Sequence, residues 1–191
     1  MTLSNPQQKK SLWSKPSKKW LLGIPIGGFL AFILGAIALG GFHYGMTYTN
    51  NNDFCYGCHV GMDTIVEEYE ASPHFTNTRG VVAATCSDCH VPQEFFPKMA
   101  LKIGASVDII HMITGKINLE NFESEHRPRL AERVTHEFKE NDSKQCRYCH
   151  DVTTMDFENQ SRNASRRHQT MEARGLTCID CHAGIAHKLP E

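Results

Sequence analysis

The sequence has almost no net charge and no extended basic region beyond its first residues. Of 191 residues, 20 are Lys or Arg and 21 are Asp or Glu. Five lysines lie within residues 1–19, which contain no acid, so the remainder holds 15 basic against 21 acidic residues, a formal charge of −6. That remainder lacks the basic stripe of a nucleic-acid-binding surface, and we expect no nucleic-acid partner. A moderately acidic body is typical of a domain that docks partners electrostatically, although solubility alone also explains it.

Charged residues are also absent from the 33 positions between Trp20 and Asn52, if His43 is neutral. The strongly apolar part, residues 20–44, exceeds the ~20 apolar residues that a helix needs to cross a bilayer. No lysine or arginine follows before Arg79. The positive-inside rule therefore predicts a single span over 20–44, with residues 1–19 in the cytoplasm and residues 45–191 on the far side.

A cleaved signal peptide is the alternative interpretation of this segment, with Ala36-Ile-Ala38 as its cleavage site. The apolar core of a signal peptide runs about 7–15 residues, whereas here apolar residues continue past that site through Leu39 and Phe42. We favour a retained anchor. Both interpretations place the body of the chain outside the cytoplasm.

No cysteine falls outside one pattern, Cys-x-x-Cys-His, which is the attachment signature of c-type haem. Two thiols at this spacing reach the two vinyl groups on one edge of the macrocycle, and the adjoining histidine points its imidazole at the iron. Four copies predict four covalent c-type haems, held on the periplasmic side of a bacterial inner membrane. The attachment residues are Cys55, Cys58 and His59; Cys86, Cys89 and His90; Cys146, Cys149 and His150; and Cys178, Cys181 and His182.

Other cysteine chemistries fit this pattern poorly. Zinc ribbons pair two Cys-x-x-Cys knuckles ~15–20 residues apart and need no fixed histidine. Here 27 residues separate Cys58 from Cys86 and 28 separate Cys149 from Cys178, and each knuckle has its histidine. Disulfide frameworks and iron–sulfur clusters do not require that histidine either. Haem attachment is therefore the favoured interpretation.

The motifs are arranged as two copies of one unit, which is motif, histidine, motif. His74 and His168 are the internal histidines, and His187 follows the last motif. We predict these three as distal iron ligands, and we expect His126 and His136 to lie on the surface. Met62, three residues after His59, is the candidate for the first haem, although a core or membrane-facing role is equally open.

Hydrophobic patterning is sparse after the apolar segment, so four haems would themselves supply the core. The expected fold is mainly α with long loops. It comprises one N-terminal transmembrane helix and a multihaem cytochrome c domain, residues 45–191, built from a duplicated two-haem unit. Such a duplication places the haems as two packed pairs.

With these motifs the chain resembles the NapC/NirT/NrfH family of membrane-anchored tetrahaem cytochromes c. The stretches Ala84–Pro92, Phe96–Met99, Thr177–His182 and Gly184–Pro190 are most similar to the NapC branch. The resemblance implies oxidation of membrane quinol and electron delivery to periplasmic nitrate reductase, whereas the NrfH branch forms a complex with a nitrite reductase. It also implies distal ligation by the three histidines named above, and a quinol site that includes Asp108 and Lys102.

Residues 93–114 predict an amphipathic helix, since apolar residues recur there at helical spacing. On periodicity alone, this helix packs on haem or rests on the membrane surface. The resemblance favours a quinol pocket, because oxidation of quinol requires a base for its protons. Asp108 is the preferred base, with His111 second, and Lys102 would stabilise negative charge on the quinol oxygen.

The expected function is therefore that of a quinol dehydrogenase, fed by menaquinol or ubiquinol from the membrane quinone pool. The first haem would receive the electrons, and a periplasmic terminal reductase, preferably nitrate reductase, would take them. The alternatives are a donor to nitrite or another reductase, a shuttle without quinol chemistry, and a terminal reductase in its own right. Association between copies of the chain is left open.

Overall fold

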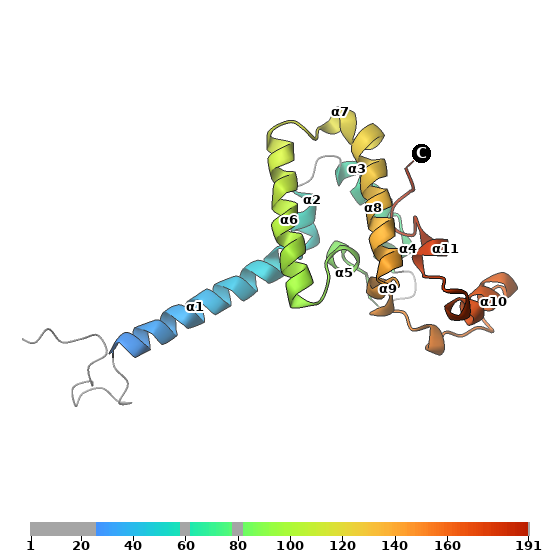
Figure 1. The fold of residues 1–191 in the computed structure, drawn as a ribbon, viewed down its shortest axis with the longest axis horizontal. Helices are drawn as coiled ribbons and strands as arrows, with labels where there is room; N and C mark the ends of the chain where they lie inside the picture. The colour runs from blue at the N-terminus through green and yellow to red at the C-terminus, as the bar shows by residue number, and fades with distance from the viewer. Residues whose placement is uncertain (1–25, 58–61, 78–81, 191) are drawn as a thin grey trace, which may run out of the picture. The chain divides into compact units, whose positions relative to one another are not determined.

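The computed structural model describes residues 26–57, 62–77 and 82–190. Within these ranges the chain forms helices and turns and contains no strand (Figure 1), as the mainly α prediction requires. The chain divides into two compact units, Met1–Thr49 and Asn50–Glu191. Cys58, His59 and residues 1–19, for which the sequence makes predictions, lie outside the described residues.

The first unit contains a single described helix, α1 (Ile26–Tyr48), of 23 residues. At 1.5 Å per residue it is about 34 Å long, enough for the ~30 Å hydrocarbon core of a bilayer. It is apolar on every face and exposes large side chains such as Phe32 and Leu39. By length and composition Gly27–Tyr48 can cross a membrane. The helix is continuous through Ala38.

The second unit is built from short helices joined by loops. Its two long helices are α6 (Phe95–Ile113) and α8 (Arg127–Glu140), the latter preceded by a π-helical turn over Phe122–His126. The remaining helices are α2 (Asn52–Tyr56), α3 (Met62–Glu70), α4 (Pro73–Thr76), α5 (Cys86–His90), α7 (Leu119–Asn121), α9 (Lys144–Arg147), α10 (Arg162–Thr170) and α11 (Ile179–His182), with 3₁₀ turns at Val152–Thr154 and Glu172–Arg174.

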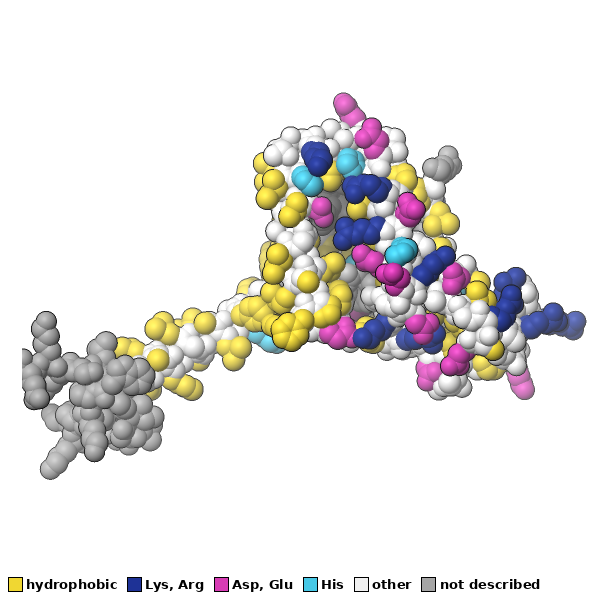
Figure 2. All heavy atoms as spheres, viewed as in Figure 1, with side chains coloured by type: hydrophobic (Ala, Val, Ile, Leu, Met, Phe, Trp, Pro, Cys, Tyr) yellow, Lys and Arg dark blue, Asp and Glu magenta, His cyan; other side chains and the backbone are white. Residues whose placement is uncertain are grey.

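The helix predicted over 93–114 is present as α6, which ends one to two residues short of each predicted bound. Its apolar residues are largely exposed, with Phe96 at 82% and Ile103 at 66% exposure (Figure 2). The helix therefore does not bury its apolar stripe against the rest of the unit.

A hydrophobic core is nearly absent from the described residues. Only Tyr69 and Met171 are buried hydrophobic side chains there. The Tyr69 hydroxyl donates a short hydrogen bond to the Ala84 carbonyl, and its ring meets the edge of Phe75 at 5.2 Å between centroids. A domain of this length ordinarily buries about two thirds of its surface. Something other than its own side chains must fill its interior.

Candidate haem centres

Each described motif histidine lies opposite one of the three predicted distal histidines. Ring centroids are 6.2 Å apart for His74 and His150, at an interplanar angle of 83°. They are 6.1 Å apart for His90 and His187, at 30°. His168 and His182 are 6.0 Å apart at 22°. Two metal–imidazole bonds of about 2 Å in line, with half a ring at each end, span about 6 Å. Each pair thus has the spacing of two axial ligands on one metal.

The distal rings have the environment that a ligating histidine needs. The Nδ1 atom of His168 lies 2.7 Å from Gln160 Oε1. That oxygen can accept a hydrogen bond from the Nδ1–H group, which leaves Nε2 free to bind a metal. The Nδ1 atom of His74 is buried with no protein partner among the described residues. Burial lowers the pKa of the His74 and His187 rings and favours the neutral imidazole that binds metal.

The cysteines join the motifs into a series. Cys55 and Cys86 lie within hydrogen-bonding reach of each other, and so do Cys146 and Cys178. Helix α5 of the second motif packs against α9 of the third motif. Burial raises the pKa of the Cys86 and Cys146 thiols to about 11 in each case. The first motif therefore adjoins the second, the second the third, and the third the fourth.

Two equivalent residues fix the neighbouring motifs within each half of the chain. Asn52, three residues before Cys55, accepts a hydrogen bond from the Cys86 backbone N–H at 2.9 Å. Ser143, three residues before Cys146, is fully buried and accepts from the Ile179 N–H at 3.2 Å. In both halves a polar side chain ahead of one motif thus satisfies the first turn of the next motif helix, where backbone donors lack partners.

The second motif of each half is also closed by the same cap. Asp88 Oδ2 accepts from the backbone and hydroxyl of Thr85 at 2.7 and 2.8 Å. Asp180 Oδ2 accepts from Thr177 at 2.8 and 2.9 Å. These bonds, together with the Lys139 ammonium at 3.0 Å, lower the pKa of Asp180 to about 2. The Thr-Cys-x-Asp-Cys-His pattern therefore builds its own helix start.

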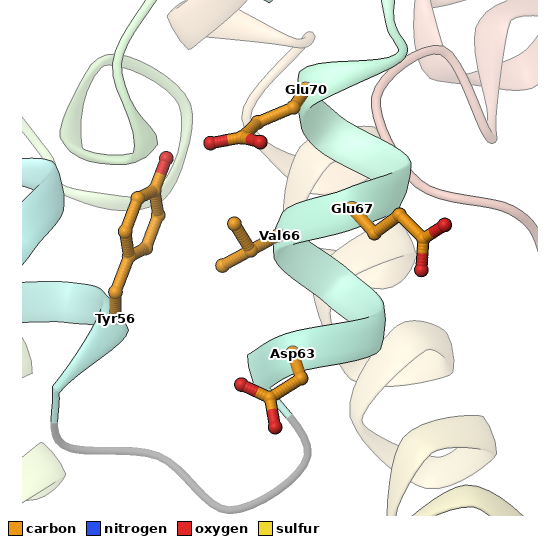
Figure 3. A pocket seen from close by; sticks show the side chains of 5 residues that line it. All are labelled: Tyr56, Asp63, Val66, Glu67 and Glu70. Atoms are coloured by element: carbon orange, nitrogen blue, oxygen red, sulfur yellow. The ribbon is translucent and has the colours of Figure 1, made fainter.

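Two of the motif histidines, His150 and His182, are exposed residues. A cavity of about 510 Å³ lies between α2 and α3, and Figure 3 shows Val66 and Glu70 pointing toward Tyr56 across it. Paired histidines, adjoining thiols and a missing core are together what c-type haem groups would complete, so the residues fit this cofactor.

Comparison with known proteins agrees with this chemistry. Residues 16–191 match the model of the NapC/NirT cytochrome c family, N-terminal region. This chain belongs to the NapC/NirT cytochrome c family. Cytochrome c-type protein NapC of Haemophilus influenzae is 43% identical over 195 residues, covering 100% of this chain and 94% of the relative. NapC of Escherichia coli K12 is 41% identical, covering 94% and 88%.

A third relative extends the range of names. Denitrification system component NirT of Stutzerimonas stutzeri is 40% identical over 192 residues, covering 98% of this chain and 93% of the relative. No solved structure matches the chain. Sequence similarity over nearly the full length therefore identifies the chain as a membrane-anchored c-type cytochrome of the NapC/NirT family. Such a cytochrome carries electrons to periplasmic reductases.

The first haem motif of this family member is only partly described. Cys55 lies in α2, next to its last residue, while Cys58 and His59 lie outside the described residues. Met62 opens α3, three residues after His59. Its ligation of the first haem stays a prediction.

The candidate quinol residues lie on one helix. Lys102 is half-buried, and burial lowers its pKa although coupling to Cys55 opposes this shift. Asp108 is exposed and His111 half-buried. Six residues on a helix place Asp108 about 120° around the axis from Lys102. Of these three residues, Lys102 is the one whose charge interacts with Cys55 of the first motif.

The surplus histidines have ordinary surface surroundings. His136 is exposed and lies 3.5 Å from Glu140, as the surface prediction requires. His126 is half-buried, and its Nδ1 atom lies 3.2 Å from Arg129 Nη2. Neither faces another histidine at the spacing of an axial pair among the described residues.

Sequence reasoning missed one structural centre, the buried Arg127. Its Nη2 atom lies 2.5 Å from Glu68 Oε2 and donates to the Lys188 carbonyl at 3.0 Å. Glu68 in turn accepts from the Lys188 N–H at 2.9 Å. The pair thus holds both the backbone N–H and the carbonyl of Lys188, the residue that follows His187. No signal distinguishes this arginine from the other charges of its helix, whereas the Thr-Cys-x-Asp-Cys-His caps are visible in the sequence.

Proposed function

We propose that this chain is a membrane-anchored tetrahaem quinol dehydrogenase. It takes electrons from menaquinol or ubiquinol and delivers them to a periplasmic terminal reductase. The resemblance to the NapC branch favours nitrate reductase as that acceptor. The observation that carries the proposal is the set of three histidine pairs, whose ring centroids are 6.0–6.2 Å apart. The cysteines of successive motifs lie near one another, so the pairs belong to neighbouring motifs.

The histidine pairs support one assignment of the iron ligands. His187 would join His90 on the second haem, His74 would join His150 on the third, and His168 would join His182 on the fourth. Met62 would complete the first haem with His59. When bound, each c-type haem supplies one-electron oxidation and reduction at its iron. Two histidines on an iron leave it no open position for a substrate.

We propose the domain plan predicted from the sequence: a cytoplasmic segment over 1–19, a span over 20–44 and a periplasmic haem domain over 45–191. The lysines of the first segment support this orientation. Equivalent thiol contacts and equivalent acceptors at Asn52 and Ser143 support a duplicated two-haem unit. The duplication is not symmetric in its ligands, because His74 faces the third motif and His168 the fourth.

The quinol site is proposed on α6, beside the first motif. A quinol releases two protons with its two electrons, so a carboxylate must accept protons as charge leaves. Asp108 is exposed and can pass a proton to solvent. The half-buried Lys102 ammonium stabilises negative charge developing on a quinol oxygen. His111 is the second candidate for the base.

Reduction by quinol tests this proposal. In membranes containing the full chain, a menaquinol or ubiquinol analogue should reduce the haems. Asp108→Asn and Lys102→Ala should each slow that reduction at least about tenfold, since a positioned base contributes 10²–10⁴-fold. Lys98→Ala, one turn earlier on α6, is the matched control. A wild-type protein that quinol cannot reduce would reject the function, and a loss of haem content would assign the variants a structural role.

A second acceptor has a specific observation in its favour. The relative NirT is named as a component of a denitrification system. We therefore keep a nitrite reductase or another periplasmic reductase as the alternative electron acceptor. Electron transfer rates from the reduced chain to each purified reductase distinguish the two.

A further inference from the structure

The described arginines of the haem domain differ in their partners: Arg129 lies beside His126, and the other seven form two groups. Arg127, Arg133 and Arg147 each have a carboxylate oxygen within 3.2 Å. In contrast, four arginines near the C-terminus have no carboxylate within 4.0 Å among the described residues. We name this second group the α10 arginine patch, and its members are Arg162, Arg166, Arg167 and Arg174.

The patch is concentrated and exposed. All four side chains are exposed, and three of them lie on the nine-residue helix α10. Residues 161–174 contain one acid, Glu172, so the segment carries +3 within a haem domain whose overall charge is negative. Figure 2 shows dark-blue side chains gathered over α10 at the right of the view. A cluster of charges of one sign creates a positive surface potential that attracts anionic groups of a partner.

The same helix carries the distal ligand of the last haem. His168 faces His182, and the neighbours Ala164 and Ser165 are half-buried on the same side. Arg162 and Arg166 project from the opposite side of α10, about 120° or more from His168 at 100° per residue. A helix is about 10 Å across, so the patch lies about one helix diameter from the last iron ligand.

We propose that the α10 arginine patch is the docking surface for an acidic patch on the periplasmic reductase that receives the electrons. The inference rests on the proposed function. It places the acceptor against the helix that ligates the fourth haem, the last in the series of adjoining motifs. Arginine suits this role because its planar guanidinium binds carboxylates in a bidentate geometry and is weakly hydrated.

Electrostatic docking of this kind acts mainly on the rate of association. Steered partners associate at up to 10⁸–10⁹ M⁻¹s⁻¹ at low salt, against about 10⁵–10⁶ M⁻¹s⁻¹ without steering. Removing three of the four charges should therefore slow transfer at least about tenfold at low ionic strength. The Debye length falls to about 3 Å at 1 M salt, so the difference should vanish there.

The test uses the full chain in detergent, reduced beforehand and mixed with purified periplasmic nitrate reductase in a stopped-flow instrument. The variant Arg162→Gln/Arg166→Gln/Arg174→Gln should show the slowing and its salt dependence. The matched control, Lys116→Gln/Arg129→Gln/Arg133→Gln, removes the same charge from exposed positions elsewhere and should transfer as fast as the wild type. Equal rates for both triple variants at low salt would overturn the proposal.

Two further measurements separate this inference from the proposed function. Oxidation of the reduced chain by anionic ferricyanide should slow in the patch variant, while oxidation by cationic hexaammineruthenium(III) should not; this comparison needs no protein partner. A wild-type chain that fails to reduce the nitrate reductase rejects that acceptor and leaves the patch testable. Slower haem reduction by quinol would assign the patch to lipid, and loss of the fourth haem would assign it to haem binding; either result overturns docking.

Discussion

One buried ion pair, between Arg127 and Glu68, binds the backbone N–H and carbonyl of Lys188, the residue after His187. We expect this contact to position the last distal histidine. Arg127 and Glu68 expose only 9% and 10% of their side chains. Glu68 accepts the Lys188 N–H, and Arg127 donates to the Lys188 carbonyl. A second carboxylate, Glu123, lies 2.9 Å from Arg127 but is half-exposed. The pair therefore joins α3 and α8 to the C-terminal segment.

Replacing Arg127 by Met should destabilise the protein by about 3–5 kcal/mol, because it leaves the Glu68 carboxylate buried without its cation. That loss is a large part of a typical domain stability of about 5–15 kcal/mol. The first effect should be local, since a loss of 3 kcal/mol raises the population of the detached His187 segment more than 100-fold. The double variant Arg127→Met/Glu68→Gln removes both charges and should recover most of the loss.

Two measurements on the detergent-solubilised holoprotein check this. Guanidinium unfolding gives the change in free energy, and the spectrum of the ferric haems reports the change from low spin to high spin as His187 leaves an iron. Arg133→Met is the control, because its pair with Glu137 is exposed and should contribute less than about 0.5 kcal/mol. An Arg127→Met protein as stable as this control, with four low-spin haems, would refute the reasoning.

Two other contacts give predictions of the same kind. Ser143→Ala removes a buried acceptor for the Ile179 N–H and should cost about 1–3 kcal/mol in guanidinium unfolding, whereas an unchanged midpoint would mean that water replaces the hydroxyl. Gln160→Leu removes the partner of His168 Nδ1, makes that ligand a weaker donor and should raise the reduction potential of one haem; four unshifted potentials in a redox titration would argue against His168 as a ligand.

Short sequence patterns point to the candidate haem ligands. The repeat singles out His74 and His168, and His187 stands out by its place after the last motif. Each of the three faces a motif histidine in the structure, and their ligation of iron stays a prediction. Periodicity likewise located α6 to within two residues. These features depend on local geometry, which a single sequence specifies well.

The pairing of ligands across the chain was not predictable. A literal reading of the repeat gives each internal histidine to its own half, yet His74 faces His150 and His187 faces His90. Such long-range contacts depend on how the halves pack. Arg127 is a similar case, because its burial follows from the return of the C-terminal segment to α3 and α8. In its own helix it is one charge among many.

The mass of the intact mature protein tests the central claim most directly. If each Cys-x-x-Cys-His motif holds a haem, the mass equals that of the chain, starting from its retained N-terminal segment, plus four haem groups. All eight cysteines should then resist alkylation, because thioether bonds consume them. A mass equal to the bare polypeptide, with alkylatable thiols, would contradict the account.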